Sequence, residues 1–73
     1  MEKLTAIYER TDDGWWVVCV PEIPGAHSQG RTLGEAREMV RDAVRLLLEA
    51  RREEAVRRAG EAGREVIVEP LEV

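Results

Sequence analysis

The sequence predicts an α+β fold in which an antiparallel sheet carries one long helix on one of its faces. Three observations support this class: β-branched and aromatic residues fill residues 4–20, apolar residues recur at three- and four-residue spacing through residues 33–59, and a short valine- and isoleucine-rich run occupies residues 65–69. The expected order is β-β-β-α-β. With 73 residues, the chain is expected to form a single domain spanning residues 1–73.

The first half of the chain predicts three strands. Residues 4–9 mix β-branched, aromatic and polar side chains, and Asp12, Asp13 and Gly14 favour a tight turn. Residues 15–20, Trp-Trp-Val-Val-Cys-Val, are the strongest strand signal in the sequence. A rigid connection with two prolines follows, and residues 26–29 are expected to form a short third strand.

A long helix is predicted to begin after Thr32. Thr32 followed by Glu35 matches a capping box, in which each side chain accepts a hydrogen bond from a free N–H group of the first turn. The apolar stripe runs to Leu47 and a charged run follows it. The helix is expected to continue to about Ala59, with Gly60 and Gly63 ending it. Residues 65–69 predict a final short strand.

The second strand is apolar on both sides, which one helix cannot cover. An even-residue loop around Gly14 would place Ile7 on the same face as Trp16, Val18 and Val20. If the helix covers the other face, this face remains open to a partner. The predicted oligomer or partner interface therefore comprises Trp16, Val18, Val20, Val66 and Val68.

Chain length also favours self-association. A domain of this size buries only about 60% of the surface that its unfolded chain exposes, and its one cysteine cannot form an internal disulfide. A helix over residues 33–59 would be about 40 Å long, whereas a six-residue strand spans about 20 Å. The distal part of the helix is therefore expected to extend beyond the sheet, and the chain is expected to form a homodimer or a larger homo-oligomer.

The residues whose side chains could act in catalysis or metal binding are more simply explained by structural roles. Cys19 lies among valines and is expected to be a buried, inert thiol, and His27 has no evident partner residues. Asp12 and Asp13 are typical turn residues, although such a pair could hold a cation. Glu22 is expected to be exposed, with contact to a basic partner as the alternative. The sequence thus predicts no catalytic residue, no metal site and no cofactor, and therefore a protein that is not an enzyme.

Composition narrows the classes of function. The chain is 44% hydrophobic and 36% charged, which is typical of a folded protein with a charged surface. Its net charge of −4 argues against direct nucleic-acid binding. No apolar run is long enough to cross a membrane, and the first residues lack the pattern of a signal peptide. A cytoplasmic location without membrane association is expected.

Several short motifs occur in a specific order. They are Asp13-Gly14-Trp15 before the valine-rich strand, Pro21-Glu22-Ile23-Pro24-Gly25 after it, Ser28-Gln29-Gly30-Arg31-Thr32 before the helix, and Glu35-Ala36 in its first turn. In this order the motifs resemble the HicB family of small bacterial antitoxins. The similarity runs from the hairpin into the helix, and the element order extends it to nearly the whole chain.

This resemblance implies a degenerate ribonuclease-H-like fold that lacks the catalytic acids. It also implies a protein that binds and masks a HicA-type toxin, a small basic ribonuclease that cleaves mRNA. An acidic antitoxin would be electrostatically complementary to such a partner. Many HicB proteins carry a C-terminal DNA-binding segment, and none is expected in a sequence that stops at Val73.

Two alternatives remain open at the level of sequence. The chain could be a homo-oligomeric α+β binding protein that has no toxin partner. It could also be a vestigial metal-dependent nuclease that uses Asp12, Asp13 and Glu22.

Overall fold

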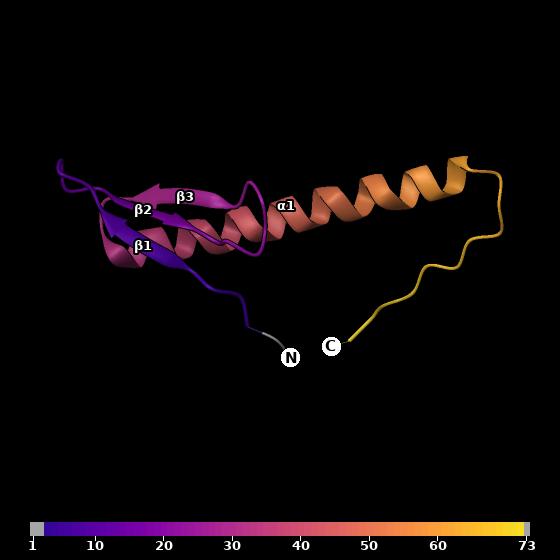
Figure 1. The fold of residues 1–73 in the computed structure, drawn as a ribbon, viewed down its shortest axis with the longest axis horizontal. Helices are drawn as coiled ribbons and strands as arrows, with labels where there is room; N and C mark the ends of the chain where they lie inside the picture. Colours follow the sequence, from indigo (N-terminus) through magenta and orange to yellow (C-terminus); the bar gives the residue numbers. More distant parts are fainter. Residues whose placement is uncertain (1–2, 73) are drawn as a thin grey trace.

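A computed structural model describes residues 3–72 of the chain, so residues 1, 2 and 73 of the expected domain lie outside the described part. Three strands are followed by one helix: β1 (Ile7–Arg10), β2 (Trp16–Cys19), β3 (His27–Gly30) and α1 (Leu33–Glu61). The strands form an antiparallel sheet in the order β1-β2-β3. Figure 1 shows the sheet packed on the first half of α1. The predicted α+β class and its first four elements are confirmed.

The β1–β2 connection determines which residues share a face of the sheet. Residues 11–15 connect the two strands, with the Thr11 N–H bonded to the Trp15 carbonyl at 2.8 Å and Gly14 at a φ of 88°. This connection has five residues, so Tyr8 lies opposite Val18 in the β1–β2 register. The expected even-residue loop is wrong. The predicted pairing of faces is therefore shifted by one residue, because side chains alternate along a strand.

The start of α1 is close to the prediction. The Thr32 hydroxyl accepts a hydrogen bond from the Glu35 N–H at 3.0 Å, as a capping residue does. The Glu35 carboxylate accepts from the Arg31 N–H at 3.3 Å, one residue before the position that a capping box predicts. The helix ends at Glu61, slightly later than expected, and Gly63 follows with a φ of 69°.

The core lies between one face of the sheet and the first half of α1. Its buried members are all apolar: Val18, Val20, Ile23, Ala26, Ala36 and Val40. Gly30 makes this packing possible, because a Cβ atom there would lie 2.5 Å from the backbone nitrogen of Ala36. The end of β3 therefore contacts the first turn of α1 without an intervening side chain.

This packing corrects part of the predicted interface. Val18 and Val20 are only 3% and 5% exposed, and Trp16 is partly buried against the same core. All three therefore belong to the face that α1 covers. The error lies in the choice of face, because α1 covers the side of β2 that was expected to be open. The shifted register adds Tyr8 to this covered face and leaves Ile7 on the open one.

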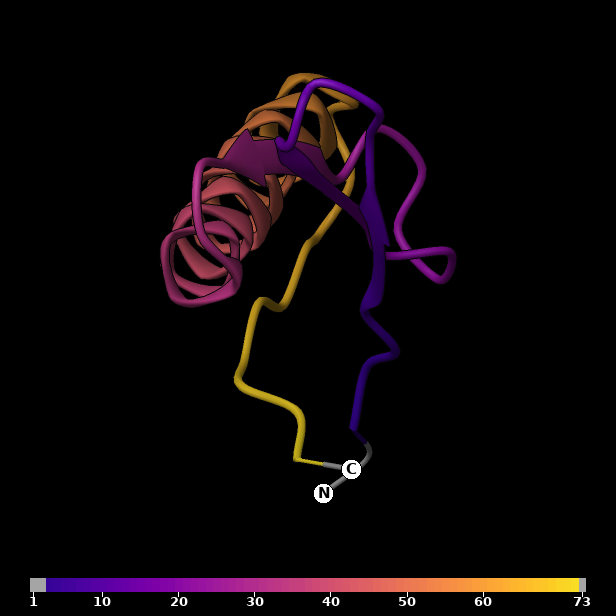
Figure 2. The same cartoon turned by 90° about the vertical axis from the view of Figure 1, so that its left-hand side faces the viewer.

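The second half of α1 and the C-terminal segment lie beyond the sheet. In Figure 1 the helix continues past the strands, and the chain then turns back beneath it. Figure 2 shows this returning segment and the segment before β1 on the same side of the molecule. Residues 65–69 are exposed and form no strand in the single chain. The predicted final strand is therefore wrong for the single chain. The chain is elongated, with extents of 53 × 24 × 16 Å.

Candidate interaction surfaces

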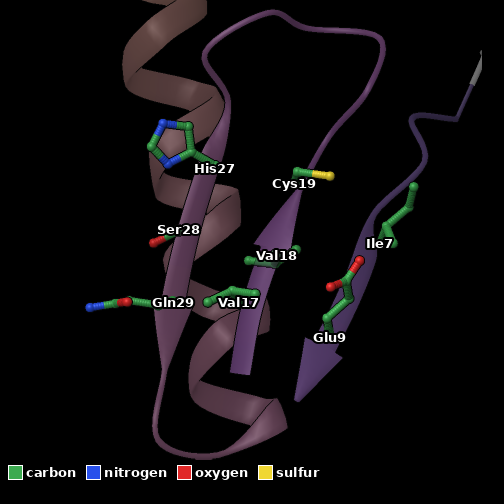
Figure 3. A pocket seen from close by; sticks show the side chains of 8 residues that line it. All are labelled: Ile7, Glu9, Val17, Val18, Cys19, His27, Ser28 and Gln29. Atoms are coloured by element: carbon green, nitrogen blue, oxygen red, sulfur yellow. The ribbon is translucent and has the colours of Figure 1, made fainter. Parts of the chain in front are cut away.

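The sheet face opposite α1 is the first candidate surface. The strand register arranges it in two rows, one of Ile7, Cys19 and His27 and the other of Glu9, Val17 and Gln29. Figure 3 shows these six side chains on the sheet, with α1 behind it. Together with Val18 and Ser28 they line a shallow hollow of about 490 Å³. We call this surface the open face.

The centre of the open face is apolar and its borders are polar. Ile7 is 44% exposed, Val17 is half-buried and Cys19 is exposed. The prediction that Cys19 is a buried thiol is therefore wrong. Glu9 on β1 and His27 on β3 flank the apolar centre on opposite strands. A narrow apolar strip with polar groups at its edges is typical of protein-binding surfaces.

The hairpin end of the sheet has its own hydrogen bonds and charges. The Thr11 hydroxyl donates to a carboxylate oxygen of Asp13, and this bond lowers the pKa of Asp13 below its ordinary value. Asp13 therefore stabilises the turn, in agreement with its predicted role there.

A second contact lies at the same end of the sheet. The guanidinium of Arg31 lies 5.4 Å from the centre of the Trp15 ring, which is within the range of a cation–π contact.

Glu22 holds the segment that precedes β1. Its carboxylate oxygens accept from the Thr5 N–H at 2.9 and 3.1 Å, and one of them accepts from the Thr5 hydroxyl at 2.7 Å. The Thr5 side-chain bond is the main cause of a lowered pKa at Glu22, with backbone hydrogen bonds adding to it. Glu22 is exposed, as expected. Contact between Glu22 and a partner stays a prediction.

The three acids of the nuclease alternative are not brought together. Asp12 and Asp13 lie in the turn before β2, whereas Glu22 follows the opposite end of β2. Among residues 3–72, no three histidine, cysteine, aspartate or glutamate side chains are grouped as metal ligands would be. This geometry gives no support to a nuclease site that uses these three residues.

The second candidate surface lies at the far end of α1. We define the arm as residues 51–61 of α1 together with the returning residues 65–71. Ala55, Val56 and Ala59 face the returning segment across a groove of about 480 Å³. Both predicted interface residues of this segment are on the arm, with Val66 42% and Val68 63% exposed. The predicted interface is thus divided between the core and the arm.

Sequence reasoning missed the open face as a surface. The signal that could have found it is the number of residues in the first turn, because that number decides which side chains of β1 and β2 share a face. Because β2 is apolar on both sides, its sequence alone does not indicate which face the helix covers.

The amino-acid sequence was also compared with known proteins. The sequence profile of a family described as the HicB-like antitoxin of bacterial toxin–antitoxin systems matches residues 4–67. The chain belongs to this family. The HicB-like match covers the sheet, α1 and the first residues of the returning segment.

Three relatives carry the name UPF0150 protein. The Synechocystis protein is 47% identical over 53 residues, which cover 71% of this chain and 72% of the relative. The Archaeoglobus fulgidus protein is 40% identical, with 68% of this chain and 72% of the relative covered. The Thermoplasma acidophilum protein is also 40% identical, with coverage of 66% and 70%. No solved structure matches the chain.

A helix that crosses a membrane must be both long and apolar. Within residues 3–72, no helix combines the length and the apolar character that a membrane span requires.

Proposed function

We propose that this HicB-like chain is the antitoxin of a toxin–antitoxin pair and acts by binding and masking a HicA-type ribonuclease that cleaves mRNA. The observation that carries the proposal is the family match over residues 4–67, which includes every regular element of the fold. In this proposal the chain is a cytoplasmic, non-enzymatic binding module. Its activity is the occlusion of another protein's site.

The open face is the proposed surface for the toxin. Its apolar centre of Ile7, Val17 and Cys19 gives contact area, and Glu9 supplies a negative charge beside it. The residues that line the hollow include no arginine or lysine. The chain as a whole carries a net charge of −4. Glu9 and the net negative charge of the chain are complementary to a basic ribonuclease, which would favour rapid encounter and disfavour acidic proteins.

Self-association is the second part of the proposal. The arm exposes large apolar side chains, since Ile67 and Leu71 on it are 81% and 87% exposed. Such an apolar surface is typical of a protein-binding site. A homo-oligomer without any toxin partner is the alternative function that this observation favours.

Inhibition of a HicA-type ribonuclease from the same genome tests the toxin-binding part. We expect the purified chain to block cleavage of a labelled mRNA in a saturable manner. Glu9→Lys should weaken inhibition by at least about tenfold, because it places a positive charge on the open face. Glu38→Lys is the matched control, since Glu38 is an exposed residue of α1 and its substitution changes the net charge equally.

Two results would contradict the toxin-binding proposal. The first is an absence of inhibition by the unchanged chain at any concentration. The second, which concerns the surface alone, is equal weakening by both variants, because net charge and not the open face would then govern binding.

A further inference from the structure

The folded chain exposes more surface than its size requires. Its accessible surface is 6417 Å² for 8.3 kDa, whereas compact monomers of this mass expose about 4,600 Å². The radius of gyration is 16.1 Å, compared with about 11 Å for a compact domain of this length. The surplus of about 1,800 Å² is about twice the area that each partner buries in a standard protein interface.

The arm contributes to this surplus. The covered part of the helix contributes Ala36 and Val40 to the core, while no residue of the arm is buried. Its groove is lined by apolar side chains from both sides. These are Ala55, Val56 and Ala59 of the helix and Val66, Ile67, Val68, Pro70 and Leu71 of the returning segment, together with Glu69. The lining of this groove is therefore apolar apart from Glu69.

The charges around the groove favour a second copy of this chain over a basic protein. The helical part of the arm carries four arginines, Arg51, Arg52, Arg57 and Arg58, and three glutamates, Glu53, Glu54 and Glu61. The returning segment adds Glu65 and Glu69, so the arm as a whole carries four arginines and five glutamates. Two copies of such a nearly balanced surface do not repel each other strongly, whereas the arm offers a basic ribonuclease no strongly acidic surface.

We propose that the arm is the self-docking surface of this protein and that its occupant is the arm of a second copy. The two helices lie antiparallel around a two-fold axis, with Val56 of each chain in the groove of the other. Each returning segment then covers the partner's helix, which buries Val66 and Val68 as the sequence predicted. A two-fold contact uses the same surface on both copies, so the assembly closes as a dimer.

This arrangement leaves both open faces free, because they lie on the sheet and not on the arm. The inference rests on the self-association part of the proposed function and not on toxin binding. A dimer built in this way would present two separate toxin-binding surfaces at the ends of an elongated particle.

Analytical ultracentrifugation of the full chain between 1 and 100 µM tests the inference. We expect twice the monomer mass of 8.3 kDa. Val56→Glu should raise the dimer dissociation constant by at least about 100-fold, because it places a charge in a desolvated contact. Glutamate is a better helix former than valine, so α1 should be retained, and circular dichroism checks this. Leu46→Glu is the matched control, since Leu46 is 65% exposed on the same helix and lies outside the groove.

A second variant examines the returning segment independently of the helix. Val68→Asp should also produce monomers, and Glu72→Lys should not. A monomeric unchanged chain at 100 µM, or a Val56→Glu variant that dimerises as tightly as the unchanged chain, would overturn the inference. The ribonuclease assay separates the two proposals. If the Val56→Glu variant is monomeric and still inhibits the toxin, both proposals are supported. If the unchanged chain is a dimer but inhibits no toxin, only the self-docking proposal is supported.

Discussion

The two halves of α1 both carry apolar residues at helical spacing, but the second half is more highly charged and the two halves have different surroundings. The first half packs on the sheet and buries Ala36 and Val40, with Val44 and Leu47 partly buried beside them. In the second half only Ala59 is even half-buried. The helix has 29 residues and is therefore about 44 Å long, whereas each four-residue strand spans about 13 Å. Burial along α1 thus ends where the sheet ends.

The comparison shows that an amphipathic helix does not by itself decide what it packs against. Both halves carry apolar residues at helical spacing and charged residues between them. In the first half the sheet covers the apolar side. In the second half no part of residues 3–72 covers it apart from the returning segment across the groove. The apolar side of the helix therefore stabilises the fold of the single chain in the first half, whereas in the second half apolar residues such as Val56, which is 43% exposed, remain accessible.

The largest expected difference concerns two glycines, one on β3 that packs against the first half of α1 and one within its second half. Gly30→Ala should cost about 3 kcal/mol of unfolding free energy, because the added methyl group would meet backbone atoms of α1 at 2.5 Å. Gly60→Ala should instead stabilise the chain by about 0.5–1 kcal/mol, because the position is helical and has nothing within 4 Å. Urea unfolding of the two variants measures both effects. Equal effects at the two positions would contradict the close contact between β3 and α1.

A smaller difference is expected for two valines of α1. Val40→Ala should cost about 2 kcal/mol at every protein concentration, since Val40 is 5% exposed in the core of the single chain. Val56→Ala should have little effect at low concentration and a larger one at high concentration, where dimers form. Thermal unfolding at 2 and 200 µM measures this. If the cost of Val56→Ala does not depend on concentration, the difference between the halves has another cause.

The smallest effect concerns pH and the segment before β1. The folded-state pKa of Glu22 is lowered, chiefly by the hydrogen bond from the Thr5 side chain. Its stabilising contribution is therefore fully present above the unfolded-state pKa and is lost as the pH falls through the lower folded-state value. Glu22→Gln should make the unfolding free energy less dependent on pH below about pH 4.5. Urea unfolding between pH 6 and pH 3 measures this, and an unchanged pH dependence would show that the Thr5 contact contributes nothing.

Much of the fold could be predicted because its signals are local. The valine-rich run of β2, the Asp-Gly turn before it and the cap at Thr32 each depend on neighbouring residues. The family resemblance likewise follows the order of short motifs, and the match over residues 4–67 confirms it. The length of α1 was also close to its expected value, because its apolar pattern and terminal glycines are read along the chain.

The surfaces were harder to predict because they depend on how elements meet. The helix covers the face of β2 that carries Trp16, Val18 and Val20, so these residues pack in or against the core and not in the expected interface, and Cys19 on the other face is exposed. Strand formation by residues 65–69 requires a neighbouring edge, and the arm holds these residues away from the sheet in the single chain.

The sequence by itself determined the types of the first four elements, the start and approximate length of the helix, and the family. These properties follow from backbone preferences and from apolar spacing within single segments. Only the tertiary structure decided which face of the sheet the helix covers and how much of the helix the sheet can bury. Both depend on register and on relative length, since a shift of one residue reverses a strand and a short sheet cannot cover a long helix.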